Sequence, residues 1–287
     1  MPFYIYAWIA SFSGAFLVIA AKLTTKYSIK NPWLFNFSWI LITLLFTIPA
    51  ALINHAGIPN DWPPVIAAGV FFALFYIFYI FANYKLDVSV LSPLFNFKSV
   101  FTVLLSSIMI NEKLSSYQLM IFAIILIAGM FANMDEKLKL NSFFKSAVGI
   151  VLLSMIFLSL NNIYINIALV KNDLWTVILW IAIVNFLVIL PTIPLFYKDL
   201  GKVKVNQIAP VIAMGIFQLL YNFVANIAYG VNVGVTSIII TLPISMMIIF
   251  LLSVVWPKLL EKHTLKVYAI RFASAAIMIW GALQLSR

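Results

Sequence analysis

The chain has 287 residues, of which 64% are hydrophobic and 9% are charged. A soluble globular domain carries about 25% charged residues, so this composition excludes a soluble enzyme or binding module and indicates a multi-pass membrane protein. The formal net charge is +10, but the basic residues stand singly in short connections and form no cluster of the kind that binds nucleic acid.

Apolar runs long enough to cross a bilayer recur along the whole chain, since a hydrocarbon core of about 30 Å needs about 20 helical residues. They cover residues 3–21, 33–53, 63–82, 88–110, 117–133, 145–168, 174–195, 208–230, 232–255 and 265–285. The first run has no basic residues before it, which favours a first membrane helix over a cleaved signal peptide. Because every connection is short, we expect an all-α integral membrane protein with ten transmembrane helices in a single domain, residues 1–287.

The fourth and ninth runs share a pattern. Residues 91–94 (LSPL), which contain Pro93, recur as residues 241–244 (TLPI), which contain Pro243, and Glu112 recurs as Glu261. Both spacings are about half the chain, so we predict two repeats, about 1–135 and about 143–287. Five helices per repeat is an odd number, which inserts the second repeat upside down, as in many secondary transporters with a midplane substrate site. Each proline is predicted to be a hinge, the alternative being a proline that a membrane helix tolerates.

A motif follows the Pro93 helix. It consists of Glu112, Lys113, Leu114, Gln118 and Gly129. In this motif the chain resembles the ten-helix EamA-like family of the drug/metabolite transporter superfamily, although Asn111 stands where the family has glycine and the second half fits more loosely. The resemblance implies a secondary transporter or exporter of a small organic metabolite. It also implies a central cavity between the helices other than the fifth and the tenth.

One charge, Lys98, lies near the middle of the fourth run. A lysine at that depth costs on the order of 2.5–3.5 kcal/mol on insertion scales, and the nearer interface is about 15 Å away, beyond the reach of its side chain. We expect Lys98 to be a cationic anchor for a substrate carboxylate, phosphate or carbonyl. The alternative is pairing with backbone carbonyls near Pro93. Thr102, one turn further on the same face, could share the ligand.

The carboxylates point to the charge of the substrate. All of them fall in predicted loops or at helix ends: Asp61, Asp87, Glu112, Asp135, Glu136, Asp173, Asp199 and Glu261. None is therefore expected inside the membrane to pair with Lys98, to hold a cationic drug or to relay protons. A neutral, zwitterionic or anionic substrate, such as an amino acid or a sugar phosphate, is favoured.

Polar side chains at helical spacing mark the expected lining of the cavity. They are Tyr76 and Tyr79 in the third run, Asn162 and Asn166 in the sixth, and Gln218, Asn222 and Asn226 in the eighth. The alternative is hydrogen bonding between membrane helices, at about 0.6–2 kcal/mol a pair. We predict that together they bind substrate.

Other functions stay open as alternatives: a non-transporting accessory membrane subunit, or a multidrug or cationic-metabolite transporter of the same superfamily. An enzyme is not expected, because the runs lack convergent acids, histidines and cysteines, and we expect no metal and no cofactor. The expected partners are a small-molecule substrate and the lipid bilayer, without nucleic acid, and a homodimer is left open. The expected location is the plasma (inner) membrane.

The orientation in the membrane is predicted in two conflicting ways. The even-numbered connections and the C-terminus hold Lys113, Lys171 and Arg287. The odd-numbered connections hold Lys22, Lys26, Lys30, Lys85, Lys137, Lys139, Lys145, Lys198, Lys202, Lys204, Lys258, Lys262 and Lys266. The positive-inside rule therefore places both termini outside, whereas the resemblance implies termini inside.

Overall fold

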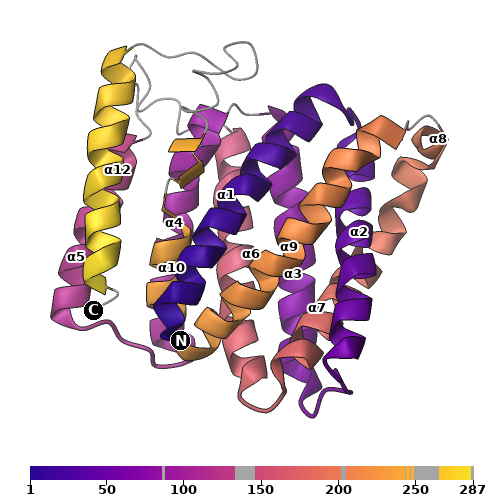
Figure 1. Ribbon diagram of the computed structural model, residues 1–287, viewed down its shortest axis with the longest axis horizontal. Coiled ribbons are helices and arrows are strands. Elements are labelled where there is room, and N and C mark those ends of the chain that lie inside the picture. The colour runs from indigo at the N-terminus through magenta and orange to yellow at the C-terminus, as the bar shows by residue number, and fades with distance from the viewer. Residues whose placement is uncertain are drawn as a thin grey trace.

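Helices form the described part of the chain, and no strand occurs in it (Figure 1). The computed structural model describes residues 1–85, 88–132, 146–201, 205–242, 244–245, 247–248 and 265–285. Its helices are α1 (Phe3–Tyr27), α2 (Pro32–Ile53), α3 (Trp62–Lys85), α4 (Val88–Met109), α5 (Ser116–Ala132), α6 (Ser146–Leu169), α7 (Leu174–Ile189), the 3-10 helix η2 (Leu190–Leu195), α8 (Tyr197–Leu200), α9 (Val205–Val231), α10 (Val233–Ile240) and α12 (Leu265–Leu285).

Within the described residues, 6 helical segments are long and apolar enough to cross a membrane. They lie in α1, α2, α3, α6, α7 continued by η2, and α9. Shorter apolar helices cover Phe95–Met109, Ser116–Phe131 and Phe272–Leu285. The prediction of an all-helical, multi-pass membrane protein is thus confirmed, while the count of ten membrane helices stays a prediction.

Local sequence sets where several helices begin. Asn31 precedes α2, and its side chain accepts hydrogen bonds from the backbone N–H groups of Trp33 and Leu34. Asp173 caps α7 through the N–H of Thr176, and Asn232 caps α10 in the same way. Such side-chain oxygens satisfy N–H groups that a first helical turn leaves without a partner.

Two predicted helices end earlier than their apolar runs. The run 174–195 was expected to be one helix, but α7 stops at Ile189 and continues as η2, which contains Pro191 and Pro194. Proline lacks an N–H donor and clashes with the preceding turn, so two prolines prevent a regular α-helix here. The run 232–255 begins with the short α10, which ends at Ile240, and the part of the run after Ile248 lies outside the described residues.

Each long helix packs against one or more neighbours in the bundle. α1 packs on α9 and α6 on α3, α2 packs on α9 and α7 on α3, and α4 packs on α6 and α10 on α1. α2 also packs on α7, and α5 on α12. The α5–α12 pair lies at one side of the bundle, at the left in Figure 1.

Candidate functional site: a central cavity with a buried lysine

Lys98, on α4, is buried at 1% exposure. Its Nζ donates a hydrogen bond of 2.8 Å to the hydroxyl of Tyr229 on α9 and lies 5.5 Å from the centre of the Tyr229 ring. No carboxylate among the described residues forms an ion pair with it. An ammonium group has three N–H donors, so the bond to Tyr229 leaves donors for a ligand.

The backbone around Lys98 is fixed to α6 by a chain of hydroxyl groups. Thr102 donates from Oγ1 to Oγ of Ser159 over 2.9 Å, and Ser159 Oγ lies 3.0 Å from the carbonyl oxygen of Lys98. Both hydroxyl-bearing side chains are fully buried. Thr102 therefore holds α4 against α6, and the structure does not bring it to a cavity where it could share a ligand.

A cavity of about 140 Å³ opens beside Lys98. Its aromatic walls come from Trp39, Phe72, Phe75, Tyr76, Tyr79, Phe95 and Tyr221, and its polar lining from Ser11, Asn83, Asn96, Lys98, Gln218, Thr241 and Ser245. Ring contacts hold the walls: Tyr76 meets Trp39 edge-on at 5.0 Å, and Tyr79 meets Phe95 edge-on at 5.4 Å. The combination of a mostly apolar wall with a few polar groups is typical of a small-molecule site.

A second, smaller cavity of about 30 Å³ adjoins the first. The two share Phe72, Tyr76, Leu158 and Tyr221 as lining residues. The polar lining of the small cavity consists of Thr43, Asn161, Asn162, Asn185, Asn222 and Asn226, together with the tyrosines 76, 221 and 229.

The structure brings most of the sequence-predicted site residues to these cavities. Lys98, Tyr76, Tyr79 and Gln218 line the large cavity, and Tyr76, Asn162, Asn222 and Asn226 line the small one. Asn166 lines neither, because its Nδ2 donates to the carbonyl oxygens of residues 229 and 230 at the end of α9. Of the predicted hinges, Pro93 belongs to α4 but its side chain lies outside the described part of the chain, and Pro243 lies outside the described residues altogether.

Several lining residues were not predicted from the sequence. Asn185 is the one amide in the otherwise apolar α7, and that contrast was a usable signal. Thr43, Trp39 and Tyr221 gave no comparable signal, because threonine and aromatic residues are common throughout the membrane runs.

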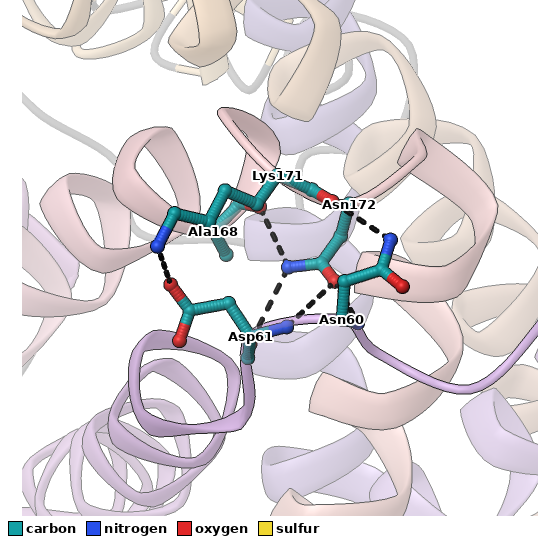
Figure 2. A network of polar contacts seen from close by, with 5 residues as sticks. All are labelled: Asn60, Asp61, Ala168, Lys171 and Asn172. Atoms are coloured by element: carbon teal, nitrogen blue, oxygen red, sulfur yellow. Dashed lines mark hydrogen bonds and ion pairs between the residues drawn. The ribbon is translucent and has the colours of Figure 1, made fainter.

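At one end of the bundle, a polar network joins the connection before α3 to the connection after α6 (Figure 2). The Oδ1 of Asn172 accepts from the backbone N–H of Asn60 over 2.7 Å, and its Nδ2 donates to the carbonyl oxygen of Ala168 over 2.8 Å. Asn60 donates in turn to the carbonyl oxygen of Lys171, and Lys171 forms an ion pair of 3.1 Å with Asp61. Asn172, which is 7% exposed, therefore ties the two connections together at this end of the bundle.

Glu112, in the connection after α4, caps a helix. Its carboxylate accepts from the backbone N–H groups of Val233 and Gly234, at 2.9 and 2.7 Å. It thereby joins the connection after α4 to the start of α10. Among the described residues, no group of three histidine, aspartate or glutamate side chains could hold a metal ion.

The described helices form a bundle with two polar-lined cavities between them, an arrangement that secondary transporters also have. Residues 1–134 match the model of the EamA-like transporter family, which belongs to the drug/metabolite transporter superfamily, in agreement with the resemblance seen in the sequence. No curated protein matches the sequence. A protein of known crystal structure is similar in fold, with a TM-score of 0.75, over 97% of this chain and 95% of that chain, at 15% sequence identity.

Proposed function

We propose that the protein is a secondary transporter or exporter of a small neutral, zwitterionic or anionic organic metabolite, held at Lys98 in the central cavity. The observation that carries the proposal is a buried lysine that lines a cavity and has only the Tyr229 hydroxyl as a hydrogen-bond partner among the described residues. Carboxylate and phosphate oxygens form strong, charge-assisted hydrogen bonds with an ammonium group.

The helix contacts support two repeats of five helices each. Exchanging residues 1–135 with 143–287 turns the α1–α9 contact into α6–α3, α2–α9 into α7–α3, and α4–α6 into α10–α1, and each of these contacts is present. The α2–α7 and α5–α12 contacts each join corresponding helices of the two proposed repeats, so the same exchange leaves them unchanged. α1 begins at the edge of the bundle where α6 ends, at the bottom of Figure 1, as opposite insertion of the repeats requires.

The ends of the bundle support alternating access. The Asn172 network joins the two proposed repeats at one edge, and a bond of 2.8 Å from Asn31 to Asp199 joins them near α8, at the opposite edge of Figure 1. The Asp61–Lys171 pair is largely exposed on its lysine side, and such a pair contributes about 0–1 kcal/mol. The neutral bonds contribute about 0.5–1.5 kcal/mol each, so substrate binding can supply enough free energy to open this edge.

The experiment is a thermal-shift screen of metabolite classes on purified protein, since a ligand that binds the native state stabilises it. We expect a carboxylate- or phosphate-bearing ligand to stabilise the wild type. Lys98→Met should weaken its affinity by about 10- to 100-fold, the equivalent of one lost charged hydrogen bond. Lys113→Met, an exposed lysine just after α4, is the matched control and should bind as the wild type does. Unchanged affinity in Lys98→Met would remove Lys98 from the site.

The alternatives make different predictions. No described carboxylate lines either cavity, which argues against a multidrug or cationic-metabolite transporter, and stabilisation by cations alone would favour that function. Co-purification with one stoichiometric partner would favour an accessory subunit. The proposed location is the plasma (inner) membrane, and a homodimer is open to a mass measurement in detergent.

A further inference from the structure

The small cavity between α2, α6, α7 and α9 is lined by an unusual density of uncharged polar groups. Thr43 comes from α2, Asn162 from α6 and Asn185 from α7, while Asn222 and Asn226 come from α9. Asn161 of α6 also lines it. The remaining lining residues are aliphatic or aromatic, and no charged side chain is among them.

Three of these groups are buried without a partner among the described residues. Oγ1 of Thr43, Nδ2 of Asn162 and Oδ1 of Asn185 accept or donate no hydrogen bond there, and the side chains are 8%, 2% and 4% exposed. Buried polar groups in proteins are almost always paired, because an unmade bond is costly. Unpaired groups from three helices around one cavity therefore indicate a missing occupant.

The lining also defines the chemistry of that occupant. An asparagine amide offers a donor at one end and an acceptor at the other, whichever way it is turned. The cavity thus suits an uncharged group that both donates and accepts, such as a hydroxyl or a carboxamide. Its volume of about 30 Å³ leaves room for one such group or for one or two water molecules.

The small cavity is linked to the lysine site by Tyr229, in addition to the lining residues that the two cavities share. Tyr229 lines the small cavity and accepts the hydrogen bond of Lys98, which lines the large one. We infer that the small cavity is a second subsite, which takes the hydroxyl or carboxamide end of a substrate whose anionic end is held at Lys98. This inference rests on the proposed function and narrows its substrate class to molecules with one anionic end and one uncharged hydrogen-bonding end.

The test uses matched probes in a thermal-shift titration of the full chain. Succinamate, glutaramate and adipamate carry a carboxylate and a carboxamide at increasing separation. Their analogues with an isopropyl group in place of the carboxamide have the same shape without the hydrogen bonds. We expect at least one amide-ended probe to bind the wild type about 10-fold more tightly than its analogue, the equivalent of one hydrogen bond to an otherwise unpaired group.

Variants then locate the preference. Asn185→Leu should abolish the preference for the amide and leave the isopropyl-ended probe bound as before. Asn36→Leu is the matched control, because Asn36 is equally buried and unpaired but lines neither cavity. Thr43→Val, which keeps the shape of the side chain, replaces Asn185→Leu if that variant does not fold.

The outcomes separate the subsite from the proposed function. Carboxylates that bind through Lys98 with no preference for the amide, or a preference that survives Asn185→Leu and Thr43→Val, would overturn the subsite alone. If no probe stabilises the wild type, or if binding survives Lys98→Met, the lysine anchor fails and the subsite fails with it.

Discussion

At the residue scale, the unusual feature is that the buried ammonium group of Lys98 has one hydrogen-bond partner and no ion pair among the described residues. Removing an ammonium group from water costs several kcal/mol even after the surroundings relax. Tyr229 returns part of that free energy through its hydroxyl and its ring face. A lysine held only for stability would be expected to have a carboxylate beside it. The arrangement is better explained if a ligand completes the site.

We predict that Tyr229→Phe lowers the free energy of unfolding by about 1–3 kcal/mol, because it removes the buried hydroxyl that accepts from Lys98 and keeps the ring. The double variant Lys98→Met/Tyr229→Phe should cost less than the sum of the two single variants, since the residues are in direct contact. Thermal unfolding in detergent measures both.

Tyr117→Phe is the control for this prediction, because it removes an exposed hydroxyl that lies 3.3 Å from Gln284. It should change stability little. Additive effects of Lys98→Met and Tyr229→Phe would show that the hydrogen bond contributes nothing.

Site residues differ in how far the sequence could identify them. Lys98 could be found because a charge inside an apolar run has a known cost, and Asn222 and Asn226 because they repeat on one helix face. Thr43 and Asn185 could not be grouped, since they reach the same cavity from different helices and only the packing of α2 on α7 joins them. Thr102 and Asn166 were expected in the site, but they line neither cavity and bond to neighbouring helices instead. Spacing along a helix identifies a polar face but does not say which neighbour that face meets.

At the element scale, α10 depends on a distant segment for its start. Its first N–H groups have no partners within the helix. Glu112, which follows α4, accepts from two of them, and Asn232 accepts from a third. A carboxylate at this position also interacts favourably with the helix dipole.

We predict that Glu112→Ala destabilises the protein by about 1–2 kcal/mol, because it leaves two N–H groups of α10 without an acceptor. Glu112→Gln keeps an acceptor but loses the charge, so it should fall between the alanine variant and the wild type. Lys113→Ala, an exposed neighbour, should have little effect. Thermal unfolding and yield of folded protein measure the series, and a Glu112→Ala variant as stable as the wild type would contradict the capping role.

Helix positions were predictable from apolar runs, and helix ends were less so. The apolar run of α1 was predicted to end at residue 21, but the helix continues through Lys22 and Lys26 to Tyr27. α7 gives way to η2 at its prolines before its apolar run ends. Hydropathy marks what lies in the membrane, whereas backbone hydrogen bonding decides where a helix stops.

At the scale of the whole molecule, the pairing of the two connections at one edge of the bundle was beyond sequence analysis. Asn60 and Asn172 are 112 residues apart, and nothing in either connection indicates the other. The pairing follows from the contacts of α3 with α6 and α7, which bring the two connections together. The spacing that suggests two repeats, by contrast, was visible in the sequence, and the repeats themselves stay a proposal that the pairwise helix contacts support.

The most direct test of the central claim measures charge-selective access to the cavity. The chain has no cysteine, so Ser11→Cys places a single thiol on the wall of the large cavity. Ser154→Cys is the control, since Ser154 is fully buried and lines neither cavity. Each variant is treated in proteoliposomes with methanethiosulfonate reagents bearing either a sulfonate or a trimethylammonium group, with rates normalised to a free thiol.

The cavity with its lysine predicts that Ser11→Cys is modified, that the sulfonate reagent reacts faster than the trimethylammonium reagent, and that Lys98→Met removes this preference. Ser154→Cys should stay unmodified. An unreactive Ser11→Cys, or one with no preference for the anionic reagent, would contradict a cationic substrate cavity at the centre of the bundle.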